Sequence, residues 1–178
     1  ALPTNTSLKT LRLAGLKFEL TELSQLIDAL ALNKSIEDLS LVEMSYRDQR
    51  WTENNAPYFK SLFPANSTIK KFTFSMPISH DTEYFHAYIS LIHALANANN
   101  IRYLILSVQD YLWHNQGSSL RQSLVAMTSL TCLKLINCLV DVVQITSLIR
   151  ECPNLKMLIL KCIIMNFNTN RYNLRPIL

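Results

Sequence analysis

The histidines and their neighbouring carboxylates are the first residues to consider as metal ligands in this 178-residue chain. Glu83, His86 and His93 fall near one face of an expected helix, and a carboxylate with two imidazoles could hold a metal ion. A di-iron helical site would need a second Glu-x-x-His and further glutamates, which the sequence lacks. His80 and His114 stand in no ligand motif. We therefore expect no metal site and no cofactor.

The cysteines are the next candidates for chemistry, as nucleophiles, zinc ligands or disulfide partners. They contain no Cys-x-x-Cys spacing, and no histidine follows the first of them to complete a zinc site. The sequence therefore predicts free thiols of a cytoplasmic protein. The four residues are Cys132, Cys138, Cys152 and Cys162.

Glycine is scarce, which excludes several enzyme classes. Gly15 and Gly117 are far apart, so no window can hold a dinucleotide-binding loop, a phosphate-binding loop or a Gly-x-Ser-x-Gly nucleophile turn. No other catalytic arrangement has a local motif. We expect no enzyme within this chain and no small-molecule substrate.

Charge and hydropathy exclude two further classes of partner. The formal net charge is +4, but the basic residues are scattered and Lys70-Lys71 is their only adjacent pair. A nucleic-acid binder concentrates its basic charge on one face, so we expect no nucleic-acid partner. No apolar run approaches the roughly 20 residues of a membrane helix, and residues 1–7 do not resemble a signal peptide. We expect no membrane association.

The elements that position these residues follow from an internal repeat. Segments starting at residues 8, 36, 69, 101, 130 and 155 read LKTLRLAGL, IEDLSLVEM, IKKFTFSMP, IRYLILSVQ, LTCLKLINC and LKMLILKCI. Counting each first residue as position 0, positions 0, 3, 5 and 8 are apolar in 22 of 24 cases. Such a pattern predicts a short strand with two core-facing side chains, then an amphipathic helix. We expect burial of Leu11, Leu13, Leu39, Leu41, Phe72, Phe74, Leu104, Leu106, Leu133, Leu135, Leu158 and Leu160.

The repeat resembles the leucine-rich repeat, and its length with a full helix is similar to the ribonuclease-inhibitor-like class. ECPNLKMLILKC resembles the cysteine-containing repeats of F-box ubiquitin-ligase adaptors. The resemblance implies an α/β horseshoe of about six strand-helix repeats, with a parallel sheet on the concave face. We expect residues 1–178 to form one such domain. Because neither end has a polar cap, we expect it to belong to a longer protein.

The residues before the strands have a turn signature. Asn5, Asn33 and Asn66 each begin an Asn-x-Ser/Thr sequence just ahead of a strand-like segment. Asparagine side chains hydrogen-bond to the backbone of such turns, so turn chemistry accounts for these sequences without glycosylation.

Two surfaces are candidates for binding. Positions 2, 4 and 6 of each repeat should point to the concave face. In the last three repeats six of these nine residues are apolar. We expect such an apolar surface to be covered by a partner or by another part of the parent chain. Loops after the second, third and fourth strands should share one rim, rich in side-chain types common in binding hot spots. The candidate partner-binding residues are Tyr46, Arg47, Arg50, Trp51, Tyr111, Trp113 and His114 on the rim, and Tyr103, Ile105, Ile136 and Ile159 on the face. Either tryptophan could instead fill space under its loop.

The resemblance implies a non-enzymatic scaffold that recognises another protein. Three contexts fit: a ubiquitin-ligase substrate receptor, the repeat region of an effector that an intracellular bacterium delivers into the host cytosol, and the sensing region of a signalling receptor. The alternatives are a repeat region attached to a catalytic or signalling domain outside this chain, and a structural role in which the apolar face packs on the parent protein.

Overall fold

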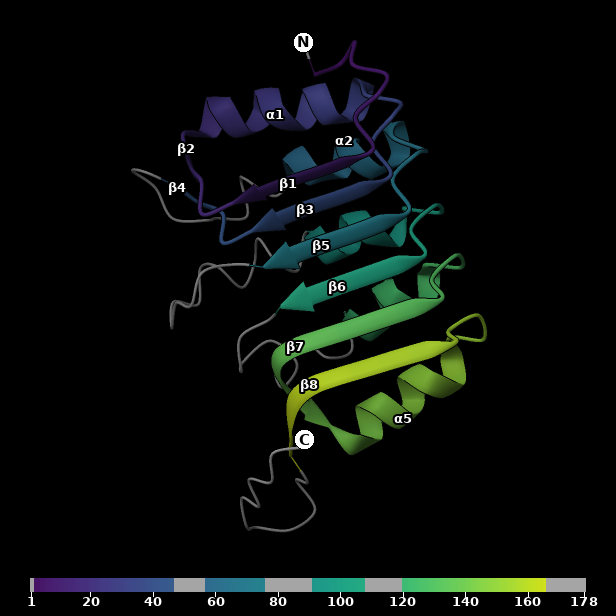
Figure 1. Ribbon diagram of the computed structural model, residues 1–178. Helices are drawn as coiled ribbons and strands as arrows, with labels where there is room; N and C mark the ends of the chain where they lie inside the picture. The colour runs from purple at the N-terminus through teal and green to yellow at the C-terminus, as the bar shows by residue number, and fades with distance from the viewer. Residues whose placement is uncertain (1, 47–56, 76–90, 108–119, 166–178) are drawn as a thin grey trace.

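Strands and helices alternate along the chain. The computed structural model describes residues 2–46, 57–75, 91–107 and 120–165 (Figure 1). The main strands are β1 (Thr10–Ala14), β3 (Asp38–Val42), β5 (Lys71–Ser75), β6 (Tyr103–Ser107), β7 (Cys132–Asp141) and β8 (Met157–Met165). The helices are α1 (Leu20–Leu32), α2 (Pro57–Ala65) and α5 (Val142–Glu151), and residues 91–96 and 120–126 are also helical. Two short strands are β2 (Lys17–Phe18) and β4 (Ser45–Tyr46).

The six main strands form one parallel sheet in the order β1-β3-β5-β6-β7-β8. Each main strand therefore pairs with the next main strand along the chain. This is expected when the connection after each strand brings the chain back to the side of the sheet where the strands begin. Figure 1 shows the strands stacked from β1 to β8 with the helices behind them, so the described helices cover one face of the sheet. We call the other face the open sheet face. The predicted parallel sheet of strand-helix repeats is confirmed.

The core lies between the sheet and the helices. Side chains alternate across a strand, so positions 3 and 5 of every repeat point to the same side. In the four central strands these residues are fully buried, as predicted. They are Leu39, Leu41, Phe72, Phe74, Leu104, Leu106, Leu133 and Leu135.

The two outer strands differ from the prediction of full burial. Leu11 and Leu13 of β1, and Leu158 and Leu160 of β8, pack against the core but are only half-buried. Each outer strand has a sheet partner on one side only, so one flank of its inner side chains lacks a covering repeat. Full burial of a repeat depends on stacking from both sides.

Aromatic residues fill the core between the second and third repeats. Phe63 of α2 meets Phe72 of β5 edge-on, with ring centroids 5.1 Å apart, and Phe59 meets Phe74 at 6.0 Å. Helix α2 begins at Pro57, which suits the first turn of a helix because proline has no N–H to lose there. The larger rings at these two leucine positions therefore find partners on the helix that packs behind them.

One backbone position repeats a left-handed conformation. Gly15, Glu43 and Asn137 have φ of 64°, 53° and 55°, and each stands at position 7 of its repeat. The turn extends the sheet's hydrogen bonding by one step, since the N–H of Gly15 donates to Val42 O and that of Glu43 to Ser75 O, both at 2.9 Å. Glycine tolerates this conformation freely and glutamate does not. The turn thus stores strain at Glu43.

Candidate binding face of the sheet

The register of the strands arranges the open sheet face in three rows. Position 2 aligns Thr10, Asp38, Lys71, Tyr103, Cys132 and Met157 across the sheet. Position 4 aligns Arg12, Ser40, Thr73, Ile105, Lys134 and Ile159, and position 6 aligns Ala14, Val42, Ser75, Ser107, Ile136 and Lys161. Neighbouring strands lie about 4.8 Å apart, so adjacent side chains in a row are close enough to contact each other.

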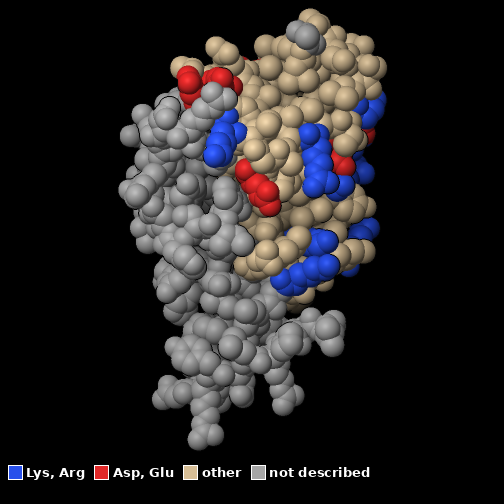
Figure 2. Space-filling view, turned by 60° about the vertical axis from the view of Figure 1, so that its left-hand side comes forward, with Lys and Arg blue, Asp and Glu red and all other residues tan. Residues whose placement is uncertain are grey.

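The first three strands make the polar half of this face. Asp38 and Lys71 are direct register partners, and their side chains form an ion pair with a distance of 2.7 Å between Oδ2 and Nζ. Figure 2, which views the molecule from the side, shows basic and acidic side chains in contact on this surface. The charges of this half are therefore partly neutralised within the protein.

The last three strands make the apolar half. Tyr103 and Met157 have 49% and 53% of their surface exposed, although both are large and apolar. Ile105, Ile136 and Ile159 are half-buried in the two neighbouring rows of the same strands. The structure therefore brings together the four face residues that the sequence singled out, and adds Met157 to them.

Two lysines interrupt the apolar half without an acidic partner. Lys134 lies between Ile105 and Ile159 in the same row, and Lys161 adjoins Ile136. Among the described residues, no carboxylate is within ion-pair distance of either ammonium group. A ligand complementary to this half would be apolar with acidic groups.

The predicted rim falls almost wholly outside the described residues. Tyr46 ends β4, whose backbone pairs with Phe18 of β2, but its side chain is outside the description. The other rim residues lie in ranges 47–56 and 108–119 and stay a prediction. They are Arg47, Arg50, Trp51, Tyr111, Trp113 and His114.

The structure describes the side chains of some of the histidines and cysteines that were considered as metal ligands or reactive thiols. His93 is exposed on the helical residues 91–96, and within the described ranges no group of metal-ligating side chains comes together. Cys132 and Cys152 are free thiols. Burial raises the pKa of the Cys152 thiol, and the adjacent Glu151 carboxylate adds to the effect. The side chains of Cys138 and Cys162 are outside the description.

The Asn-x-Ser/Thr turns have the geometry expected of turn chemistry. Asn33 Oδ1 accepts hydrogen bonds from the N–H groups of Ser35 and Ile36, both at 2.9 Å. Asn66 Oδ1 does the same for Thr68 at 2.9 Å and Ile69 at 3.2 Å. The amides also link repeats, a role that the sequence analysis missed. Asn33 Nδ2, for example, donates to Leu2 O at 2.7 Å. The signal was the recurrence of the motif three residues before position 0 of each of the first three repeats.

No protein-family profile matches the sequence, and no curated protein matches it. Among solved structures, the chain is similar to the crystal structure of an internalin from Listeria monocytogenes, with a TM-score of 0.32 and 13% sequence identity. The alignment covers 88% of this chain and 48% of the internalin chain, so this chain spans about half the length of that protein. No helix within the described ranges is long and apolar enough to cross a membrane. The repeated strand-helix units and the six-stranded parallel sheet make this a leucine-rich repeat fold.

Proposed function

We propose that the chain is a non-enzymatic recognition scaffold whose open sheet face binds another protein. The observation that carries this proposal is the exposure of large apolar side chains on a face that none of the described helices covers. Tyr103 and Met157 are each about half exposed beside three half-buried isoleucines. Apolar groups clustered in this way on a rigid surface are typical of protein interfaces.

The sheet supports this role because its geometry is fixed by the core. The inner side chains of β6 and β7 are fully buried, so the outer side chains of the same strands hold constant positions relative to each other. A pre-organised surface loses little conformational entropy on binding. Substitution of an outer residue therefore changes the surface without changing the scaffold.

The proposed interface extends to the rim beside the ends of the strands. Tryptophan, tyrosine and arginine side chains dominate the energetics of known interfaces, and the rim has all three types. Its members are Tyr46, Arg47, Arg50, Trp51, Tyr111, Trp113 and His114. The resemblance to the ribonuclease-inhibitor-like class and to F-box repeats supports two cytoplasmic contexts, a delivered bacterial effector or a ubiquitin-ligase substrate receptor.

The test is to use the whole chain as bait in cell extracts, identify a captured protein, and measure its Kd with purified components. Tyr103→Ala and Ile159→Ala should each weaken binding by about 1 kcal/mol or more, which is about a fivefold rise in Kd. Trp113→Ala and Arg50→Ala should have effects of similar size. Thr73→Ala is the matched control, since Thr73 lies in the same row on the polar half. Circular dichroism should show each variant folded.

Unchanged affinity in all four variants would place the interface on the helices or outside this chain. Loss of affinity in Trp113→Ala together with lower thermal stability would assign that tryptophan to the core. Capture of the parent protein's own flanking region alone would favour the alternative, in which the repeats pack on a catalytic or signalling domain.

A further inference from the structure

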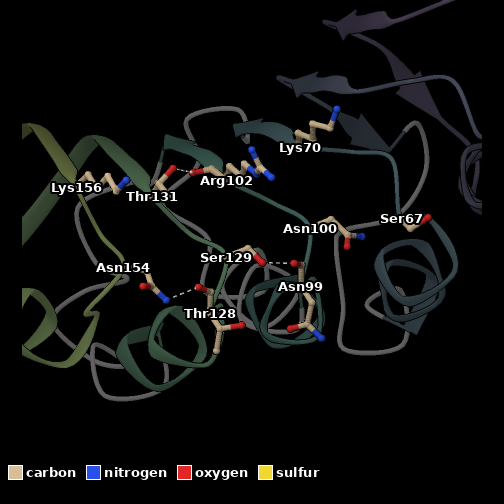
Figure 3. A pocket seen from close by; sticks show the side chains of 10 residues that line it. All are labelled: Ser67, Lys70, Asn99, Asn100, Arg102, Thr128, Ser129, Thr131, Asn154 and Lys156. Carbon is tan, nitrogen blue, oxygen red and sulfur yellow. Dashed lines mark hydrogen bonds between the residues drawn. The ribbon is translucent and has the colours of Figure 1, made fainter.

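A hollow with a volume of about 460 Å³ lies at the edge of the sheet where the strands begin. It spans the third to the sixth repeats and is lined by the residues that precede β5, β6, β7 and β8. Figure 3 shows its cationic side chains, Lys70, Arg102 and Lys156, along the strand starts, with amide and hydroxyl side chains beneath them.

The cations of the hollow are incompletely neutralised. Lys70 Nζ contacts Glu37 Oε2 at 2.7 Å, and Glu37 also faces Lys9 at 3.4 Å. Arg102 and Lys156 are exposed, and within the described part of the chain neither has an acidic side chain at ion-pair distance. No acidic residue is among those that line the hollow. It is therefore a site of net positive charge.

Several polar groups of the hollow already donate hydrogen bonds within the protein. Asn100 Nδ2 donates to Asn66 O at 3.2 Å, and Asn154 Nδ2 donates to Thr128 O at 2.7 Å. The hydroxyl of Thr131 donates to Arg102 O at 3.1 Å. Among the described residues, no hydrogen bond uses the amide oxygens of Asn100 or Asn154. Those oxygens remain available as acceptors.

The combination of free acceptors and unpaired cations selects the chemistry of the ligand. Peptide N–H groups can donate to amide oxygens, whereas a phosphodiester backbone has no donor to offer them. Acidic side chains on the same peptide would meet Arg102 and Lys156. The hollow also adjoins the apolar half of the open sheet face, because Arg102 precedes Tyr103 and Lys156 precedes Met157.

We propose that this hollow binds an acidic peptide segment of a partner protein, with carboxylates on Arg102 and Lys156 and backbone N–H groups on the amide oxygens of Asn100 and Asn154. The proposal rests on the proposed function, since it names the chemistry of one segment of the partner. Apolar residues next to the acidic ones would continue onto Tyr103 and Met157.

The test measures binding of a fluorescein-labelled octapeptide of alternating glutamate and alanine to the full chain by fluorescence anisotropy at low ionic strength, where charge attraction is least screened. The double variant Arg102→Glu/Lys156→Glu should raise Kd about tenfold or more, since two attractions become repulsions. Glu37→Gln should lower Kd about twofold, because it releases Lys70. Arg102→Gln/Lys156→Gln, which adds no repulsion, should give an intermediate Kd.

Two controls distinguish a site from general attraction to a basic protein. Lys17→Glu changes an exposed cation of β2, which follows the end of β1, and should leave Kd within twofold of the wild type. The same peptide with lysine in place of glutamate should not bind. Equal losses in Lys17→Glu and in Arg102→Gln/Lys156→Gln, or no binding of the glutamate peptide at all, would overturn the proposal.

Tighter binding of an oligothymidylate than of the peptide, with the same dependence on Arg102 and Lys156, would also overturn it in favour of nucleic acid. Failure here is separable from failure of the proposed function. A partner whose affinity depends on Tyr103 and Ile159 but not on Arg102 and Lys156 would leave the open sheet face as the interface and remove only the hollow.

Discussion

The Nδ2 atom of Asn66 donates a hydrogen bond of 2.8 Å to the backbone carbonyl of Asn33, the residue at the same position one repeat earlier. A second bond of 2.7 Å runs from the same nitrogen to Leu30 O. Both asparagines are buried, with 0% and 2% of their surface exposed for Asn33 and Asn66. A buried amide that joins two repeats is therefore part of how these units stack.

Asn66→Ala should destabilise the fold strongly, because it leaves two carbonyls and two N–H groups without partners in a buried turn. Each unsatisfied buried group costs about 1–3 kcal/mol, and partial access of water reduces the sum. We therefore expect the free energy of unfolding to fall by about 3 kcal/mol. Urea denaturation should show a lower midpoint at unchanged slope.

The matched control for this prediction is Asn154→Ala. Asn154 is exposed and donates one hydrogen bond, to Thr128 O, so its loss should cost about 1 kcal/mol or less. Equal losses in Asn66→Ala and Asn154→Ala would show that the buried amide does not link the repeats energetically.

The strand-helix repeats could be predicted from the sequence because burial acts directly on residue type. An inner position must be apolar, so the spacing of Leu39 and Leu41, or of Phe72 and Phe74, is visible in the sequence. The partial exposure of Leu11 and Leu158 could not be read in this way. It depends on whether a neighbouring repeat lies alongside, and that is a property of the stack.

The hollow was not predicted because each repeat contributes only two or three residues to it. Lys70, Arg102 and Lys156 stand at position 1 of the third, fourth and sixth repeats, far apart in the chain, and form a group only when that position is read as a column. Because the basic residues are scattered along the sequence, we expected that they would not gather on one face of the protein. Register, which comes from backbone pairing, brings them to one edge of the sheet.

The left-handed turn at position 7 yields a prediction about strain. Glu43→Gly should stabilise the fold by about 1 kcal/mol, because glycine adopts a φ of 53° without the clash that a Cβ atom causes. Thermal denaturation should show a higher Tm. The increase will be partly offset by the greater freedom of glycine in the unfolded chain.

Gly15→Ala is the reverse experiment at the equivalent position. A Cβ atom at Gly15 would meet no other atom within 4 Å, so the variant changes the backbone preference and not the packing. We expect the free energy of unfolding to fall by about 1 kcal/mol, because alanine is strained at a φ of 64°. Stability changes of the same sign in both variants would contradict the assignment of strain to this turn.

Glu37 should make the stability of the fold dependent on pH in the acid range. The side-chain hydrogen bond from Lys70, followed by that from Lys9, holds the pKa of the Glu37 carboxyl below its ordinary value of 4.5. A pKa that is lower in the folded state contributes stability above the unfolded value, and this stability is lost as the pH falls through the folded value. Chemical denaturation of the wild type and Glu37→Gln should therefore differ most at neutral pH.

The difference between these two proteins should shrink as the pH falls below the ordinary value of 4.5, and it should vanish once the pH is below the lowered pKa, where both folded proteins carry an uncharged side chain at this position. Added salt should reduce it at neutral pH, since all three side chains are exposed to solvent. A difference that stays constant from neutral pH to pH 3 would show that Glu37 acts through its shape and not through its charge.

Cys152 and Cys132 should differ in reactivity although both are free thiols. Only the thiolate reacts, and burial raises the pKa of Cys152, while the residue has just 8% of its surface exposed. Alkylation of the native protein at pH 8, followed by mass spectrometry of peptides, should therefore label Cys132 well before Cys152. In denaturant without reductant, four thiols should react. Recovery of two or none would indicate disulfides, and early labelling of Cys152 would mean that the last repeat opens readily in solution.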